Sequence, residues 1–146
     1  MKADQITYRF FTEIGILFQL SSAMLEDHLP ERMTSREFGI LGHLVRRPEG
    51  RTPLQIAQAF QVPKTSMTHS ISMLEKRGLV DVVKNPEDAR SKIVRAGDQA
   101  AEFVQSVTTA LNARMAPMIQ DVGVDTFAEA LPKLEAVRIA LDAERD

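Results

Sequence analysis

The chain has 146 residues, of which 44% are hydrophobic and 26% charged, so its composition is that of one ordinary globular domain rather than of a disordered chain. It contains no cysteine, which excludes disulfides, zinc–cysteine sites and a switch based on thiol oxidation. No signal peptide is apparent, and the longest early apolar stretch, residues 14–18, is far shorter than the roughly 20 residues of a membrane span. We therefore expect a soluble, cytoplasmic protein with no membrane partner.

The formal net charge of −2 conceals an uneven distribution of charge along the chain. From Arg32 to Arg95 there are 12 Lys/Arg and 6 Asp/Glu, whereas the two flanks together hold 6 Lys/Arg and 14 Asp/Glu. A basic middle part creates a local field that attracts phosphate whatever the overall sign of the charge. The acidic flanks also have a simpler interpretation, in which they only keep the protein soluble.

Residues 4–29 are predicted to form a long helix that is apolar around most of its circumference. One stripe at helical spacing includes Phe10, Ile14 and Leu17. A second set covers much of the other side: Phe11, Ile16, Leu20 and Met24. Pro30 ends the segment. Such a helix needs burial from two directions, and we expect helices of a second subunit to supply it.

Two shorter helices follow, and each begins with a capping box. Thr34 opens one of them, with Glu37 three residues later. Thr52 caps the next, with Pro53 at its first position and Gln55 completing the box. A loop with Pro and Gly separates the two helices.

The next predicted helix runs from Pro63 to about Arg77 and ends at Gly78. Its core stripe is narrow, with Met67, Ile71 and Leu74. The other positions through Ser72 are small or polar and are rich in hydroxyl groups: Lys64, Thr65, Ser66, Thr68, His69, Ser70 and Ser72. Serine and threonine are poor helix formers, so their concentration on an exposed face indicates a use for hydroxyl groups there.

A β-hairpin and two long helices complete the chain. Residues 79–84 and 92–95 are predicted strands joined by a turn that starts at Asn85. Asp98 is expected to cap a helix that breaks at Pro117 and near Gly123. A last helix is expected over residues 126–143, where Pro132 either introduces a kink or delays the start.

Helix, short helix, turn, polar-faced helix and hairpin form the layout of a winged helix-turn-helix. A helix fits the major groove of DNA, where Ser, Thr, Lys and His side chains near its N-terminus hydrogen-bond base edges. The helix starts at Thr52 and Lys64 present free N–H groups to phosphate. Arg90, at the hairpin tip, is the natural side chain to enter the minor groove.

Four segments of this part resemble the MarR family of transcriptional regulators in order and spacing. They are Leu54–Phe60 (LQIAQAF), Val62–Thr68 (VPKTSMT), Leu74–Val80 (LEKRGLV) and Asn85–Arg95 (NPEDARSKIVR). The resemblance implies a mainly α fold with a small β-hairpin wing. The winged helix-turn-helix, residues 31–96, would be embedded between dimerisation helices at residues 1–30 and 97–146 of one compact chain.

The resemblance also implies a homodimer that binds a pseudo-palindromic operator in double-stranded DNA. It would act as a repressor, with activation as the alternative, and would be tuned by a small, aromatic or phenolic effector. The sequence has no phosphate-binding glycine loop, nucleophile elbow or metal-binding motif, so we expect no cofactor, metal or enzymatic activity. The DNA-binding residues would be Thr52, Lys64, Thr65, Ser66, Thr68, His69, Asp88, Arg90 and Lys92, with Asp88 orienting Arg90. Apolar candidates for the effector site are Phe18, Met24 and Leu41.

The chain departs from the family pattern at several positions that bear on the operator sequence. The family often has Arg at the place of His69 and Leu at the place of Ser70, and an Asp-x-Arg pattern where this chain has Asn85, Pro86 and Glu87. Simpler interpretations stand beside the functional ones: Arg90 as an ordinary solvated charge, and the histidines as surface or structural residues. A winged helix that binds protein instead of DNA is the alternative function.

Overall fold

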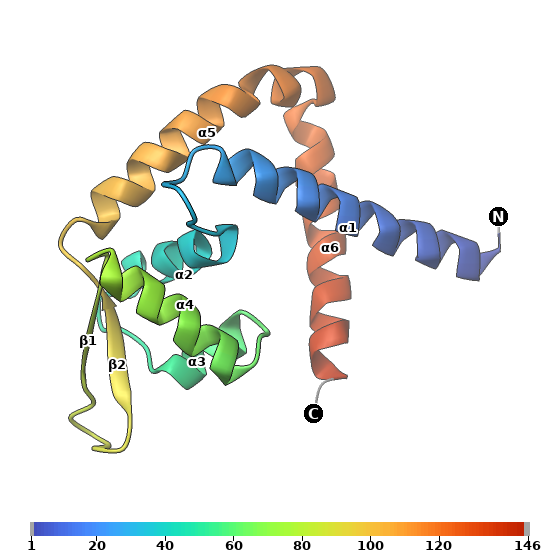
Figure 1. Ribbon diagram of the computed structural model, residues 1–146. Helices are drawn as coiled ribbons and strands as arrows, with labels where there is room; N and C mark the ends of the chain where they lie inside the picture. Colours follow the sequence, from blue (N-terminus) through green and yellow to red (C-terminus); the bar gives the residue numbers. More distant parts are fainter. Residues whose placement is uncertain (1, 145–146) are drawn as a thin grey trace. The chain divides into compact units, whose positions relative to one another are not determined.

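A computed structural model describes residues 2–144 of the chain (Figure 1). The elements in chain order are α1 (Ala3–Glu26), α2 (Ser35–Val45), α3 (Pro53–Ala59), α4 (Lys64–Lys76), β1 (Val80–Lys84), β2 (Lys92–Ala96), α5 (Ala100–Val122) and α6 (Val124–Ala143). The predicted mainly α fold with one β-hairpin is confirmed. The chain divides into two compact units between Leu111 and Asn112, within α5.

Both predicted capping boxes are present, and they fix where α2 and α3 begin. The Thr34 hydroxyl accepts from the Glu37 N–H at 3.2 Å, and the Thr34 N–H donates to the Glu37 carboxylate at 3.3 Å. The Thr52 hydroxyl likewise accepts from the Gln55 N–H at 3.2 Å, and the Thr52 N–H donates to the Gln55 side chain at 2.9 Å. Because these bonds satisfy N–H groups that a helix start leaves open, the boundaries follow from local sequence.

The core of the first unit lies among α2, α3, α4, the hairpin and the start of α5. Its fully buried large side chains are Ile40, Leu41, Leu44, Ile56, Met67, Leu74 and Val94. The aromatic rings of Phe38 and Phe103 pack edge to face at the margin of this core. Three short helices and a hairpin therefore share one apolar centre, which holds α4 in place in spite of its weak intrinsic helix propensity.

The wing is joined to the loop between α2 and α3 by backbone hydrogen bonds. β1 and β2 are antiparallel, with the register running from Val80 opposite Ala96 to Lys84 opposite Lys92. Arg51, in the loop between α2 and α3, also pairs with β2: its N–H donates to the Val94 carbonyl at 3.0 Å, and the Val94 N–H donates to the Arg51 carbonyl at 2.8 Å.

Helix α1 is largely uncovered by the rest of the chain. No side chain of α1, all of whose residues the structure describes, is buried. Tyr8, Leu17, Phe18 and Leu20 are each more than 60% exposed. The two apolar stripes expected from the sequence are therefore present, and most of their area faces outward.

Helix α6, in the second unit, is also poorly covered. It too has no buried side chain, and it exposes large apolar groups, among them Leu131 and Ile139. Within residues 2–144, no helix combines the length and the hydropathy that crossing a lipid bilayer requires.

Two helix boundaries in the first unit, the end of α1 and the start of α5, differ from those predicted from the sequence. Helix α1 ends at Glu26 instead of Leu29, because the chain tightens into turns before Pro30 and the Glu26 carboxylate accepts from the Ser35 N–H at 2.8 Å. Helix α5 begins at Ala100, after a turn in which the Ala100 N–H donates to the Gly97 carbonyl at 3.0 Å, so Asp98 does not cap it.

The predicted effect of proline on the last two helices was partly wrong. Pro117 does not break α5, which continues to Val122, and Pro132 does not delay α6, which begins at Val124. Proline removes one intrahelical donor, and the carbonyl that loses its partner at Pro117 belongs to Ala113; both residues are exposed, so water can satisfy it.

We expect Gly50→Ala to destabilise the protein strongly. Gly50 has φ +81°, and an added Cβ would lie 2.6 Å from Ile93 Cγ2 and 2.7 Å from the Val94 carbonyl oxygen. Gly78→Ala is the matched control, since its φ is +69° but no atom lies within 4 Å of the added Cβ. Chemical denaturation should show a loss of about 1–2 kcal/mol for Gly78→Ala and of about 1–3 kcal/mol more for Gly50→Ala. Equal losses would mean that the close approach of the loop to β2 is absent.

Candidate nucleic-acid interface

Helix α4 separates an apolar face from a polar one as the sequence predicts, with one exception. Met67, Ile71 and Leu74 are buried. The predicted DNA-contacting side chains on the same helix are exposed or half-buried: Lys64, Thr65, Ser66, Thr68 and His69. The exception is Ser70, which was expected on the exposed hydroxyl face but is only 5% exposed. It lies three residues after Met67, on the core stripe, where its small side chain fits.

The N-terminus of α4 is open in a way that the starts of α2 and α3 are not. Pro63 occupies the N-cap position and provides no side-chain hydrogen bond to the first turn. The N–H groups of the first turn therefore keep unused hydrogen-bonding capacity, and the helix dipole places partial positive charge beside the Lys64 ammonium. Such a helix start is suited to a phosphate or to the edge of a base. The Thr68 hydroxyl donates to the Lys64 carbonyl at 2.9 Å, so its oxygen remains free to accept.

The tip of the wing presents Arg90 to solvent, with 93% of its side chain exposed. Asp88 accepts from the Arg90 N–H at 3.0 Å and lies 3.5 Å from Arg90 Nε, so the contact expected between these two residues is present. The Glu87 N–H donates to the Asn85 side-chain oxygen at 3.0 Å, and the Asn85 amide donates to Ser91 Oγ at 2.8 Å. These local bonds order the turn that carries Arg90.

The two remaining predicted DNA-binding residues, Lys92 and Thr52, lie in β2 and directly before α3. Lys92 is exposed and faces Lys84 across the hairpin. Thr52 is half-buried, and its hydroxyl oxygen is already engaged in the capping box of α3.

The three predicted effector residues do not share one surface. Phe18 is 67% exposed on α1, Met24 is half-buried near the end of the same helix, and Leu41 is fully buried in the core. Among residues 2–144, no group of three His, Asp or Glu side chains is arranged to hold a metal ion.

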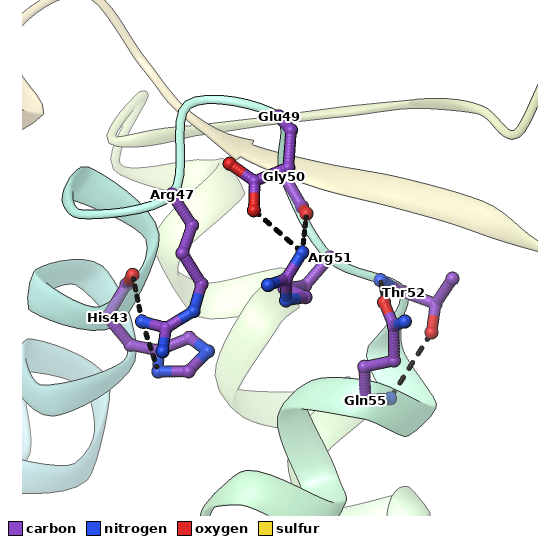
Figure 2. A network of polar contacts seen from close by, with 7 residues as sticks. All are labelled: His43, Arg47, Glu49, Gly50, Arg51, Thr52 and Gln55. Atoms are coloured by element: carbon purple, nitrogen blue, oxygen red, sulfur yellow. Dashed lines mark hydrogen bonds and ion pairs between the residues drawn. The ribbon is translucent and has the colours of Figure 1, made fainter.

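Sequence reasoning missed a group of arginines at the end of α2 and in the following loop (Figure 2). We call Arg46, Arg47 and Arg51 the arginine cluster. Arg47 Nη1 lies 3.2 Å from His43 Nδ1 and donates to the His43 carbonyl at 3.3 Å. Arg51 forms an ion pair with Glu49 at 2.8 Å and donates to the Gly50 carbonyl at 3.2 Å. A sequence signal was available: Glu49 is the only acidic residue between Phe38 and Leu74.

The surroundings of His43 lower the pKa of its imidazole. Partial burial lowers the pKa of the His43 imidazole below its ordinary value of 6.5, and the positive charges of Arg47, Arg46 and Arg51 lower it further. The neutral ring is therefore the favoured form. It packs edge to face on Phe60 with ring centroids 5.6 Å apart, and its Nδ1 can accept from Arg47.

Comparisons of the sequence and of the fold with known proteins both point to the MarR family of transcriptional regulators. A sequence model of the MarR family matches residues 33–91. The fold is similar to that of the transcriptional regulator BldR from Sulfolobus solfataricus, with a TM-score of 0.78 and 20% identity over 93% of this chain and 99% of that one. It is also similar to a mutant MarR from E. coli complexed with operator DNA, with a TM-score of 0.78 and 18% identity over 94% of this chain and 99% of the other.

A third solved structure, the PcaV regulator from Streptomyces coelicolor in complex with its natural ligand, matches with a TM-score of 0.72 and 22% identity. The match covers 88% of this chain and 90% of PcaV. At such identities the structures establish a shared fold, and the family match covers the part of the chain from α2 to the turn of the wing.

We expect the stability of the protein to fall on acidification because of His43. The folded state lowers the pKa of this ring below 6.5, so the unfolded chain binds a proton more readily than the folded one. The contribution of His43 is therefore complete above pH 6.5 and is lost as the pH falls through the folded-state pKa. Urea denaturation between about pH 5 and 7.5 should show a steeper loss for the wild type than for His43→Gln. Parallel curves would contradict the expected shift.

Proposed function

We propose that this protein, a member of the MarR family of transcriptional regulators, acts as a homodimer that binds a pseudo-palindromic operator and represses transcription. The observation that carries the proposal is the pairing of two exposed features in one unit: the open, hydroxyl-rich N-terminus of α4 and the ordered wing tip with Arg90. In this arrangement α4 enters the major groove and Arg90 the adjacent minor groove. The E. coli MarR structure with operator DNA supports this use of the fold.

The proposed base and phosphate contacts follow from the side chains that α4 exposes. Lys64, Thr65 and Ser66 lie in its first turn, and Thr68 and His69 follow in its second. Ser70, being buried, is not among the proposed contacts. Lys92 and Thr52, at the start of α3, would contact the sugar–phosphate backbone of the DNA. A winged helix that binds protein would be expected to have an acidic or apolar face here, and the observed face is basic and rich in hydroxyl groups.

The proposed dimer rests on the uncovered apolar surface of α1. Large exposed apolar groups on one helix are costly in water, and a second copy that packs its own α1 and C-terminal helices against them removes that cost. Two copies related by a twofold axis would present two α4 helices to successive major grooves, which matches a pseudo-palindromic site.

The proposed effector is a small aromatic or phenolic compound that changes DNA affinity. The PcaV structure with its natural ligand supports ligand binding by this fold, and Phe18 and Met24 on α1 remain apolar candidates for contact. Leu41 could join them only if the core around α2 opened, because it is fully buried. Repression is proposed because a dimer bound across promoter DNA excludes other proteins from it.

We expect Arg90→Ala to weaken binding to the DNA upstream of the protein's own coding sequence roughly five- to 150-fold, equivalent to about 1–3 kcal/mol, without unfolding the protein. The side chain is exposed, so its loss removes no core contact. Lys76→Ala, at the far end of α4, removes a positive charge in the same unit and serves as the control. Titrations at several salt concentrations measure both variants. The proposal fails if the wild type binds duplex DNA no better than an unrelated acidic protein does.

We expect sedimentation to give about twice the chain mass of 16.3 kDa. The double variant Leu17→Glu/Leu20→Glu should sediment as a monomer, because both side chains are exposed in the protomer and charged groups oppose the burial of α1. Circular dichroism should show that the variant remains helical. A wild type that is monomeric at micromolar concentration contradicts the dimer.

We expect at least one compound from a panel of small aromatic acids and phenols to weaken the protein–DNA complex in a mobility-shift assay. Phe18→Ala should reduce the response to that compound more than it reduces DNA binding itself. A panel without effect, together with unchanged thermal stability in the presence of each compound, would count against an aromatic effector.

A further inference from the structure

The arginine cluster lies in a well-ordered loop. The Arg47 N–H donates to the Leu44 carbonyl at 2.9 Å, and the Gly50 N–H donates to the Arg47 carbonyl at 2.8 Å. Arg51 is fixed to Val94 of β2 by two backbone bonds, and the next residue, Thr52, caps α3. The loop is therefore held between the wing and the start of α3 before any ligand arrives, which lowers the entropic cost of binding.

Polar partners hold the side chains of Arg47 and Arg51, but they do not neutralise the total positive charge of the cluster. Arg47 is held by a neutral imidazole and a carbonyl, and neither carries a negative charge. Arg51 is paired with Glu49, and Arg46 is exposed at the end of α2. The cluster thus has three guanidinium groups, and Glu49 is the one acidic residue of the sequence between Phe38 and Leu74. A guanidinium fork matches the geometry of a phosphate.

We propose that the arginine cluster binds backbone phosphates of the DNA that α4 and the wing engage. The inference rests on the proposed function and adds a contact surface to it. In a helix-turn-helix, the helix before the recognition helix crosses the backbone while the recognition helix lies in the groove. The cluster occupies the loop that leads into that crossing helix, α3, and it is tied to the wing through Arg51 and Val94. Its contacts carry no base specificity, because every phosphate is alike.

His43 serves in this proposal as a positioning residue for Arg47. As a neutral ring it accepts from the guanidinium through Nδ1 and keeps it beside the end of α2. The charged groups that face this ring are Arg46 and Arg47, directly after α2, and Arg51 from the same loop, whereas Phe60, the residue that caps the end of α3, contributes an uncharged ring. A phosphate bound by the arginines offsets their charge, so DNA should raise the pKa of His43 toward its ordinary value.

The test compares Arg46→Gln and Arg47→Gln with Arg36→Gln in the 146-residue chain. Arg36 is exposed near the other end of α2, so its variant controls for the removal of one positive charge on the same helix. Each protein is titrated with two duplexes, the upstream DNA and one of random sequence, at several salt concentrations. For each phosphate that a variant no longer binds, the slope of log affinity against log salt should fall by about 0.9 in magnitude. This fall should be equal for both duplexes and absent for Arg36→Gln.

A second readout separates DNA binding from folding. The pKa of His43, followed by NMR with His43→Gln to assign its resonance, should rise when either duplex binds. Inorganic phosphate at matched ionic strength should leave it unchanged, and an equal rise with phosphate alone would reassign the cluster to a free anion.

The experiments distinguish failure of the phosphate-binding inference from failure of the proposed function. If Arg90→Ala weakens DNA binding while the Arg46 and Arg47 variants behave like Arg36→Gln, this inference is overturned and the proposed function stands. If the wild type binds neither duplex, the proposed function itself fails. Arg46 is exposed, so Arg46→Gln keeps the test decisive even if Arg47→Gln loses stability.

Discussion

The proposed DNA-binding surface depends on the pairing of Arg51 with Val94. An isolated two-stranded hairpin is marginally stable in water, and the wing has only two strands. The two backbone bonds to Arg51 and the burial of Val94 in the core give the hairpin a third partner. Gly50 makes this approach possible, because any side chain there would collide with β2. The position of Arg90 relative to α4 therefore follows from a contact in the loop after α2, far from both along the chain.

Helices α4 and α1 differ in how much of their surface is apolar. Helix α4 has poor intrinsic propensity and only a narrow apolar stripe, so it depends on Met67, Ile71 and Leu74 to hold it against α2 and α3. The rest of its surface is thereby free for polar contacts. Helix α1 has apolar side chains on nearly all sides, and the protomer leaves most of that area in water. The winged helix thus buries its apolar side chains within one chain, whereas α1 leaves most of its own exposed.

Local sequence predicted those features that local interactions determine. The capping boxes at Thr34 and Thr52 and the stop at Gly78 follow from backbone requirements within a few residues, and all are present. The narrow stripe of α4 followed from helical periodicity. Ser70 was placed on the wrong face because composition was given more weight than its position three residues after Met67. Pro117 was taken as a break because the sequence does not reveal that its helix stays exposed to water there.

The arginine cluster was missed because its one sequence signal, the scarcity of acidic residues between Phe38 and Leu74, does not show which arginines come together in the fold. In the sequence, Arg46, Arg47 and Arg51 are three charges near a loop with Pro and Gly, which is a common surface pattern. Folding places the loop against β2 and the ring of His43 against Phe60 from α3. The end of α4 is anchored in a similar way, since Arg77 Nη2 donates to the Glu31 carbonyl at 2.7 Å. Glu31 lies in the linker that joins α1 to α2. The same linker is also held by the bond between the Glu26 carboxylate and the Ser35 N–H, so the ends of α1 and α4 share one anchor.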